Sequence, residues 1–288
     1  MAAPQMSSSS DLNPKAAALL LAPLTIVMLL VFVYPLLTTA WTSIHPDTGL
    51  SLAAYVELFH STLFLKTLRT TFEISISGTL VSLLIGFPVA MHLTVQPPRR
   101  RTGYLILVML PFWTSILVKS FALTVVFGNQ GLVNQFLGLV SGGTLNIPMM
   151  FNRTGVIIVM INFLLPFMIL SILGSLLAQD AMLIRAAETM GAGSFRIFWR
   201  IILPLSMPGV VAGVLINMTL SIGMYITPAL LGGRQDMMVA NLVDFYTRQT
   251  LDWTAASATA MVLFAISACL VAMLGRIRGA QGLSGAAA

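Results

Sequence analysis

Residues 154–178 read TGVIIVMINFLLPFMILSILGSLLA, a run of 25 residues that contains no Asp, Glu, Lys or Arg. A helix that crosses the hydrocarbon core of a bilayer needs about 20 mainly apolar residues, so this run is long enough to span a membrane. The sequence therefore predicts an all-α integral membrane protein with six transmembrane helices, because five other stretches have a similar length and character. These five stretches are residues 17–41, 71–95, 104–128, 207–231 and 253–275.

The composition of the chain also indicates a membrane protein. The 288 residues are 57% hydrophobic and only 8% charged, and the mean hydropathy is +0.93. A soluble domain typically has about 25% charged residues, so we expect lipid to cover much of this chain. The net charge of +6 would suggest nucleic acid as the partner of a soluble protein. In a membrane protein the basic residues set the orientation instead, and we expect no nucleic-acid partner.

The distribution of Lys and Arg predicts how the helices are oriented. With the N-terminus inside the cell, nine of these residues fall in inner segments, five in outer segments and Lys119 within a span. An excess of Lys and Arg marks the cytoplasmic side, so both termini are expected there. We expect a polar cytoplasmic tail over residues 1–15, one transmembrane domain over 16–278 and a second cytoplasmic tail over 279–288. No metal is expected, because no His, Cys or carboxylate residues have metal-site spacing, and the single Cys269 excludes an internal disulfide.

The connection between the fourth and fifth spans has a distinctive pattern. Residues 180–205 read DAMLIRAAETMGAGSFRIFWRIILPL. The pattern predicts two short helices, the first ended by Gly191 and Gly193, because glycine accepts the left-handed conformation that helix ends often need. Pro204 is expected to close the second helix, which is aromatic and basic. A compact projection of this kind could dock into a groove on another protein.

This segment resembles the coupling motif of the permease subunits of ABC importers. In that family Glu-Ala-Ala is followed by three residues, Gly, nine residues and Ile-x-Leu-Pro, and the residues that match here at the family spacing are Ala186, Ala187, Gly191, Ile201, Leu203 and Pro204. The leading Glu of the family is Arg185 here, a reversal of charge, and Glu188 lies one turn later as a candidate for the acidic group. The resemblance implies that ATPase coupling rests on Arg185, Ala186, Ala187, Glu188, Gly191, Ile201, Leu203 and Pro204.

The resemblance also implies the fold, the activity and the partners. The expected fold is that of a type I (MetI-like) importer permease, a non-catalytic subunit of the bacterial inner membrane. Because the chain has no Gly-x4-Gly-Lys-Ser/Thr loop, we expect it to bind no cofactor, with ATP and Mg held by a separate ATPase chain. The expected partners are a second, different permease subunit, two cytoplasmic ATPase subunits, an extracytoplasmic substrate-binding protein and membrane lipid.

Four short runs resemble spermidine/putrescine-type permeases, namely 111–115, 128–134, 164–168 and 227–233. This likeness implies import of a polyamine such as putrescine or spermidine. Aminoalkyl phosphonates and amino acid-like amines stay open as alternatives, because permeases for them belong to the same group. A stand-alone secondary transporter would favour buried carboxylates and inverted repeats, and neither is evident in the sequence. A membrane enzyme would need a Ser/His pairing, a metal motif or an intramembrane acid pair, and the sequence supports none of them.

Charged residues within or beside the spans are candidates for the substrate pathway, because charge inside a membrane is costly. Lys119 lies within the third span, where it could also form a structural ion pair or extend its amine to the membrane surface. Glu73, near the outer end of the second span, could pair with Lys119 or attract an amine. Asp244, with Asp236 and Asp252, flanks the outer mouth, where an acidic rim would concentrate cations. Solvated loop charges are the alternative for these three aspartates.

Aromatic and amide side chains complete the candidate pathway. Phe112, Trp113 and Tyr225 could stack on an amine by cation–π contact or could serve only in packing. Asn217 and Ser221 follow at i and i+4 and so share a face of the fifth span. They could line a pathway or hydrogen-bond to neighbouring helices.

Overall fold

A computed structural model of the protein describes residues 14–45, 49–142 and 150–285. Within these ranges every regular element is a helix, which confirms the predicted all-α class. Six helical segments are long and apolar enough to cross a membrane, in agreement with the predicted number. They are Leu21–Ile44, Thr62–Thr94, Ile116–Ser141, Arg153–Leu177, Ser194–Ile222 and Trp253–Arg276.

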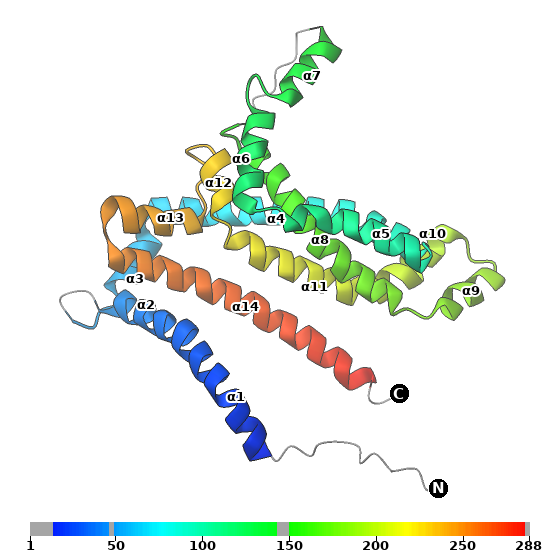
Figure 1. Ribbon diagram of the computed structural model, residues 1–288, viewed down its shortest axis with the longest axis horizontal. Coiled ribbons are helices and arrows are strands. Elements are labelled where there is room, and N and C mark those ends of the chain that lie inside the picture. Colours follow the sequence, from blue (N-terminus) through cyan, green and yellow to red (C-terminus); the bar gives the residue numbers. More distant parts are fainter. Residues whose placement is uncertain (1–13, 46–48, 143–149, 286–288) are drawn as a thin grey trace, which may run out of the picture.

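Three long helices form the centre of the bundle. Helices α4 (Thr62–Thr94), α8 (Arg153–Leu177) and α11 (Leu203–Ile222) all pack against one another, and α14 (Trp253–Gly285) covers α11. Figure 1 shows these helices side by side along the horizontal axis. Since each is apolar over most of its length, their mutual contacts bury the faces that do not meet lipid.

The bundle has two ends, which are named here after the short helices that they carry. The α9 end holds α9 (Ala181–Thr189) and α10 (Ser194–Ile197), which project beyond the bundle at the right of Figure 1. The α13 end, at the left, holds α3 (Ala53–His60) and α13 (Val239–Phe245), followed by the π-helical turn η4 (Tyr246–Thr250).

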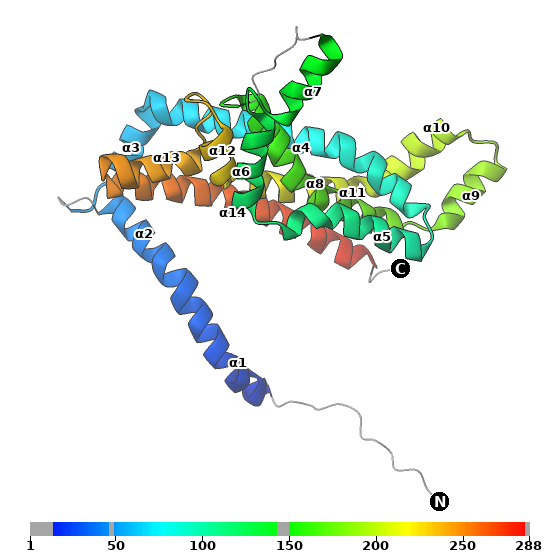
Figure 2. The same ribbon diagram turned by 45° about the horizontal axis from the view of Figure 1, so that its top comes forward.

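The first span stands away from the bundle. It consists of α1 (Pro14–Met28), the π-helical turn η1 (Leu29–Val33) and α2 (Tyr34–Ile44), and it meets the bundle chiefly where α2 packs against α14. Figures 1 and 2 both show α1 diverging from the other helices. Its exposed apolar side chains are those expected of a helix in contact with lipid.

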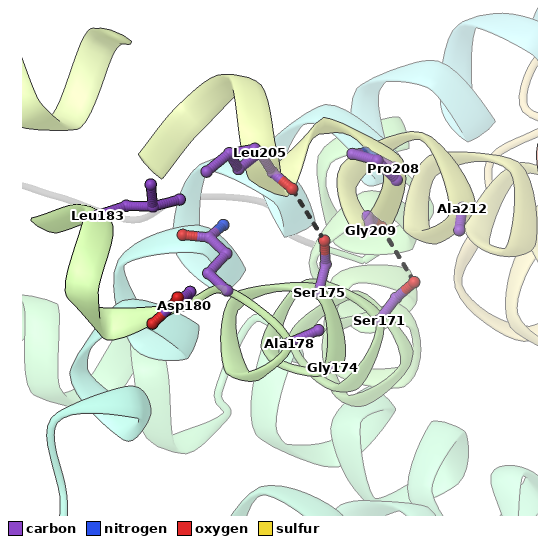
Figure 3. Close-up of a pocket in the computed structure, with 11 residues that line it drawn as sticks. Ser171, Gly174, Ser175, Ala178, Asp180, Leu183, Leu205, Pro208, Gly209 and Ala212 are labelled. Atoms are coloured by element: carbon purple, nitrogen blue, oxygen red, sulfur yellow. Dashed lines mark hydrogen bonds between the residues drawn. The ribbon is translucent and has the colours of Figure 1, made fainter. Parts of the chain in front are cut away.

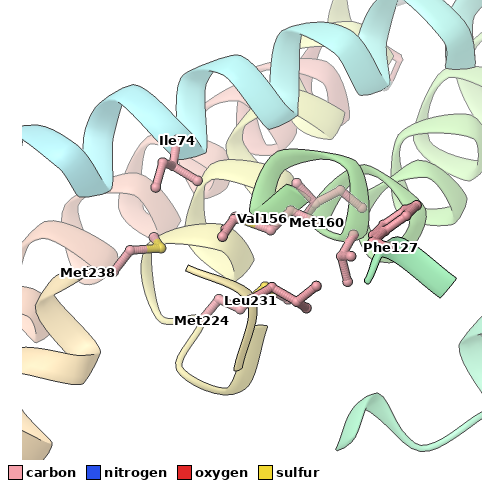
Figure 4. Close-up of a cluster of buried hydrophobic side chains, with 9 residues drawn as sticks. Ile74, Phe127, Val156, Met160, Met224, Leu231 and Met238 are labelled. Atoms are coloured by element: carbon pink, nitrogen blue, oxygen red, sulfur yellow. The ribbon is translucent and has the colours of Figure 1, made fainter. Parts of the chain in front are cut away.

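Two apolar clusters fill the centre of the bundle, and a smaller third one lies where α3, α4, α13 and α14 meet. The α13-end cluster, which is drawn in Figure 4, joins α4, α6 (Ile116–Phe127), α8 and the segment after α11, and consists of Ile74, Phe127, Val156, Val159, Met160, Leu164, Met224, Leu231 and Met238. The α9-end cluster joins α4, α8 and α11, and consists of Ala90, Leu93, Met168, Ile169, Ile172, Leu173, Leu176 and Val210. Apolar contacts between the helices of this chain therefore stabilise the bundle at both of its ends.

The third span differs from the continuous helix predicted over residues 104–128. The chain forms α5 (Pro98–Met109), the 3₁₀ turn η2 (Leu110–Trp113), α6 (Ile116–Phe127) and α7 (Leu132–Ser141). Pro111 lacks the N–H that would continue the helix, and Ser115 is extended with φ −55° and ψ 131°. As a result α6 and α7 leave the bundle in a new direction (Figure 2).

Several other helix boundaries also differ from the predicted ones. The second span begins at Thr62 rather than residue 71, and the fifth ends at Ile222, so that Ile226–Leu231 forms a separate helix, α12. Helix α14 continues to Gly285, and therefore includes residues 279–285 of the predicted second tail. Residues 1–13 and 286–288 of the predicted tails lie outside the described residues.

Candidate functional site

The projection at the α9 end begins with a well-capped helix. The Asp180 carboxylate accepts a hydrogen bond of 2.8 Å from the backbone N–H of Met182, which satisfies a free donor at the start of α9. The helix ends at Thr189, and Gly191 just after it has a left-handed φ of +79°, as the sequence predicts. A Cβ at Gly191 would meet no atom within 4 Å, so the backbone conformation and not crowding within this chain calls for glycine there.

The second half of the projection corrects a prediction. Pro204 does not close a short helix, because α10, the π-helical turn η3 (Phe198–Ile202) and α11 form one continuous helix. The N–H of Leu203 bonds to the carbonyl of Phe198, five residues back, and this wide turn accommodates the proline that follows it. The projection is thus joined directly to a central helix of the bundle.

The surface of the projection combines charge with exposed apolar side chains. Arg185, Ala186 and Glu188 are exposed, and the structure places neither Arg185 nor Glu188 in an ion pair with any described residue. Met190 and Phe195 are 81% and 79% exposed at the tip. Such side chains at the end of a short projection are suited to contact another protein. Of the other motif residues, Ala187 is buried and Gly191 and Pro204 are exposed, while Ile201 and Leu203 are half-buried.

A series of hydrogen bonds joins α8 to α11 at the base of the projection, and it is called the α8–α11 ladder. Its donors recur every four residues: Ser171 and Ser175 share one face of α8, and Gln179 follows two residues after the end of that helix. The bonds run from Ser171 Oγ to Gly209 O (3.0 Å), from Ser175 Oγ to Leu205 O (3.3 Å) and from Gln179 Nε2 to Ile202 O (3.3 Å). The first two are drawn in Figure 3, beside a groove of about 650 Å³ between the two helices.

Glycine lets the two helices of the ladder approach closely. A Cβ at Gly209 would lie 2.7 Å from the backbone oxygen of Ser171, which is closer than real Cβ atoms come. The ladder was not predicted from the sequence. The spacing of Ser171, Ser175 and Gln179 was the available signal.

The charged candidates lie at the α13 end in a network that the sequence did not predict. Glu73 bonds to Arg69 at 2.7 Å and to Arg153, and does not pair with Lys119. Arg153 also bonds to Asp236 Oδ1 at 3.2 Å, and so links α4 and α8 to the loop before α13. Asp236 is only 7% exposed, so this carboxylate is structural.

The other two aspartates of the predicted acidic rim are also engaged. Asp244 pairs with Arg248 at 2.7 Å, and Asp252 accepts a hydrogen bond from the backbone N–H of Ala255 at the start of α14. Burial and the hydrogen-bonded carboxylate of Asp244 raise the pKa of the Tyr225 phenol, so this hydroxyl stays protonated. Tyr225, Asp244 and Arg234 line a groove of about 330 Å³. In the rim, therefore, Asp236 and Asp244 are paired with arginines, and Asp252 accepts a backbone hydrogen bond at the start of α14.

The remaining candidates do not converge on one site. Phe112 packs edge-to-face on Phe167 with ring centroids 5.5 Å apart, whereas Trp113 is 83% exposed on the side of the bundle. Asn217 and Ser221 are fully buried among the helices of this chain. The structure brings only Tyr225 and Asp244 together among the candidate pathway residues.

Known proteins resemble this chain in sequence and in fold. Residues 78–276 match the family described as binding-protein-dependent transport system inner membrane component. The chain is 34% identical to the spermidine/putrescine transport system permease protein PotB of Haemophilus influenzae, over 75% of this chain and 76% of that protein.

Solved structures show the same fold at lower identity. A bacterial alginate ABC transporter in complex with an alginate pentasaccharide-bound periplasmic protein has a chain that matches with a TM-score of 0.75 and 18% identity, over 91% of this chain and 94% of that one. An inward-facing MetNI methionine ABC transporter matches with a TM-score of 0.55 and 17% identity, over 75% of this chain and 95% of that one.

Proposed function

Because this chain belongs to the family of binding-protein-dependent transport system inner membrane components, we propose that it forms part of a polyamine pathway opened by a separate ATPase. The chain is an importer permease of the inner membrane with the MetI-like fold, and this permease subunit is non-catalytic. The finer proposal names the contacts that couple it to ATP and the substrate that it carries.

The geometry of the α9–α10 projection is the observation that carries the coupling proposal. The projection exposes Met190 and Phe195 at its tip, and its base is held to the bundle by the bond from Gln179 to Ile202. An ATPase subunit that grips this tip pulls on α8 and α11 together, because both helices emerge from its base. In this arrangement ATP and Mg are bound by two ATPase subunits, and the α9 end and both chain termini face the cytoplasm.

The other proposed partners complete a pathway that one chain does not enclose. We place a second permease subunit of different sequence beside this one and a substrate-binding protein over the α13 end. Membrane lipid then covers the apolar helix faces that remain, such as that of residues 21–44.

The relationship to a spermidine/putrescine permease supports a polyamine as substrate. The groove at Tyr225 would receive an amine if the substrate displaced Arg248 from Asp244, since an ammonium group replaces a guanidinium as the carboxylate's partner. The aromatic face of Tyr225 favours a cation in the same place.

A substrate with both an amine and an acidic group is the second candidate. The groove at Tyr225 presents the carboxylate of Asp244 and the guanidinium of Arg234 together. Aminoalkyl phosphonates and amino acid-like amines carry both charges that this pair would complement.

Uptake of labelled putrescine and spermidine, measured in cells with and without this chain, tests the proposal. Loss of ATP-dependent uptake on deletion, with recovery on complementation, is the expected result. Unchanged polyamine uptake in cells that express the chain, together with lost uptake of a labelled aminoalkyl phosphonate, would assign the second candidate instead.

A variant separates coupling from substrate choice. Gly191→Val should reduce uptake of every substrate, because valine resists the left-handed conformation that shapes the tip of the projection. Gly191→Asn is the matched control, since asparagine accepts that conformation. If both variants transport equally and the chain reaches the membrane in both, the projection is not the coupling element.

A further inference from the structure

Three consecutive arginines stand at the start of α5, at the α9 end of the bundle (Figure 1). The guanidinium of Arg101 donates hydrogen bonds of 3.0–3.1 Å to three backbone carbonyls at or just after the end of α4, those of Leu93, Thr94 and Gln96. A cation is favoured at the end of a helix, so Arg101 has a structural role. Arg99 and Arg100 are exposed, and neither forms an ion pair with a described residue. Two of the three charges are therefore available to a partner.

This chain places no acidic residue beside α5 in the sequence. No Asp or Glu occurs between Glu73 and Asp180, a stretch that includes all of α5, α6, α7 and α8. The first two carboxylates after it are engaged elsewhere, since Asp180 caps α9 and Glu188 lies on the projection. An anion that binds Arg99 and Arg100 would therefore come from outside this chain.

An apolar groove begins next to Arg99, and it is called the α5 groove. It has a volume of about 430 Å³ and is lined by Thr102, Leu105, Ile106, Met109, Leu110 and Trp113. These residues recur at intervals of three and four, so they lie on one side of α5 and η2. Arg99 precedes Thr102 by three residues and therefore lies on that side too. The hydroxyl of Thr102 already donates to the carbonyl of Pro98, so the lining presents an apolar surface with a cation at one end.

The length of the α5 groove matches one leaflet of a bilayer. Helix α5 runs along the bundle (Figures 1 and 2), and from Thr102 to Trp113 the chain rises by about 16 Å at roughly 1.5 Å per residue. The hydrocarbon core of a bilayer is about 30 Å thick, so one leaflet contributes about 15 Å. Ile106, Leu110 and Trp113 are exposed, so the described chain does not cover the groove. The groove can therefore extend from the headgroups, at Arg99, to the middle of the membrane.

We propose that the α5 groove binds an anionic phospholipid, with the phosphate on Arg99 and Arg100 and one acyl chain along the apolar lining. Guanidinium groups bind phosphate through paired hydrogen bonds, and basic sites beside membrane helices recognise anionic headgroups. A free phosphate ion would leave the apolar lining unfilled. A partner helix would fill the lining but would also need a carboxylate at the level of Arg99. A phospholipid carries the anion and the apolar chain in one molecule.

A lipid in this groove would support the part of the third span that the bundle holds least. Leu105 and Val108 pack against the α9-end cluster, whereas the neighbouring side of α5 is exposed. The lipid would cover that side up to the break at Pro111, where α5 gives way to η2. The site does not depend on which solute the protein carries.

Native mass spectrometry of the purified complex, titrated with dioleoylphosphatidylglycerol in detergent, measures this binding. Arg99→Gln should lower the affinity by at least about fivefold, as expected for the loss of one basic residue at an anionic membrane surface. Arg276→Gln is the matched control, because Arg276 is an exposed arginine on another helix, α14. Dioleoylphosphatidylcholine, which has no net charge, should bind equally to both variants. Equal phosphatidylglycerol affinities in the two variants would show that only the total charge attracts the lipid, and would overturn the proposal.

A second pair of variants examines the acyl chain separately from the headgroup. Ile106→Trp places an indole ring in the α5 groove without changing any charge. Leu107→Trp adds the same ring at the next residue, outside the lining, and the two native side chains are 64% and 65% exposed, so neither change crowds the interior. We expect Ile106→Trp to weaken phosphatidylglycerol binding several-fold and Leu107→Trp to leave it unchanged. Equal affinities would show that no acyl chain occupies the groove.

The same spectra identify any other occupant. Competition by inorganic phosphate at the lipid's own concentration would assign a site for free phosphate. Loss of a second permease subunit from the complex in Ile106→Trp, with lipid binding unchanged, would assign the groove to that subunit. Either result overturns the lipid site, whereas phosphatidylglycerol binding that needs both Arg99 and an open groove supports it.

Discussion

The replacement Gly209→Ala examines the contact that joins α8 to α11. A Cβ at position 209 would lie 2.7 Å from the backbone oxygen of Ser171 and still closer to the Cβ of Ser175. Neither obstacle can rotate away, because one is a backbone atom and the other is attached directly to the backbone. The two helices must therefore either separate at the level of the α8–α11 ladder or stay in place with an overpacked contact.

The cost of this separation follows from the bonds that it disturbs. The ladder has three hydrogen bonds, each worth about 1 kcal/mol, so their loss would cost up to about 3 kcal/mol. If the helices stay in place instead, overpacking costs about 1–3 kcal/mol. Alanine returns about 1 kcal/mol through its helix propensity. The net destabilisation is up to about 2 kcal/mol, which lowers the Tm by up to about 3 °C, because a chain of this size has an unfolding entropy of about 0.6 kcal/mol/K.

Thermal unfolding of the detergent-purified complex measures this effect, with two other glycines as graded controls. Gly174→Ala, which meets no neighbour, should raise the Tm by about 1–2 °C. Gly213→Ala should fall between the two, because its nearest neighbour is the flexible Met168 side chain, whose Sδ lies 2.8 Å away. If Gly209→Ala has a Tm equal to or above that of the unchanged protein, the tight contact between the helices is wrong.

Other replacements examine the charged network and the groove at the α13 end. Arg153→Met should lower the Tm more than Arg248→Met, because the loss of Arg153 leaves the 7%-exposed Asp236 without its cation, whereas Arg248 is a surface side chain. Equal Tm values for the two variants would show that the buried carboxylate needs no partner. Asp244→Asn should raise the KM for putrescine uptake, because it removes the carboxylate that would bind an amine. Arg248→Gln should lower this KM, because it frees the same carboxylate from its ion pair. A KM unchanged in both variants would remove this groove from the pathway. Gln179→Ala should leave ATP hydrolysis in place but reduce the solute transported per ATP, because the base of the projection loses its bond to α11; an unchanged ratio of transport to hydrolysis would show that the bond plays no part in coupling.

The number of spans follows from sequence more reliably than their continuity. A membrane-spanning helix requires a long apolar run, and such runs can be recognised directly in the sequence. Proline does not act the same way in each run. Pro166 lies inside α8 and Pro204 lies within a continuous helix behind a π-helical turn, while Pro111 accompanies a break. Hydropathy reports the same apolar character in all three runs, so the break became visible only in the structure.

Local features of the candidate site were predictable, but long-range pairings were not. Gly191 was expected to be left-handed, since helix ends call for that conformation, and its φ confirms this. The partner of Glu73 was not predictable, because Arg153 lies 80 residues away and reaches it only through the packing of α8 on α4. The sequence offered Lys119 as a possible partner of Glu73, but it contains no information on which helices are neighbours.

The structure locates the stiffness of the projection at its base rather than at its tip. Within the projection only Ala187 and Ile197 are buried, so the tip gains little rigidity from packing. At the base, the carboxylate of Asp180 caps α9 and the Gln179 amide bonds to Ile202, so both ends of the projection are tied at one place. A push on the tip then moves α8 and α11 as one body. We therefore expect substitutions at Gln179, away from the exposed tip, to impair coupling as much as substitutions at the exposed Met190.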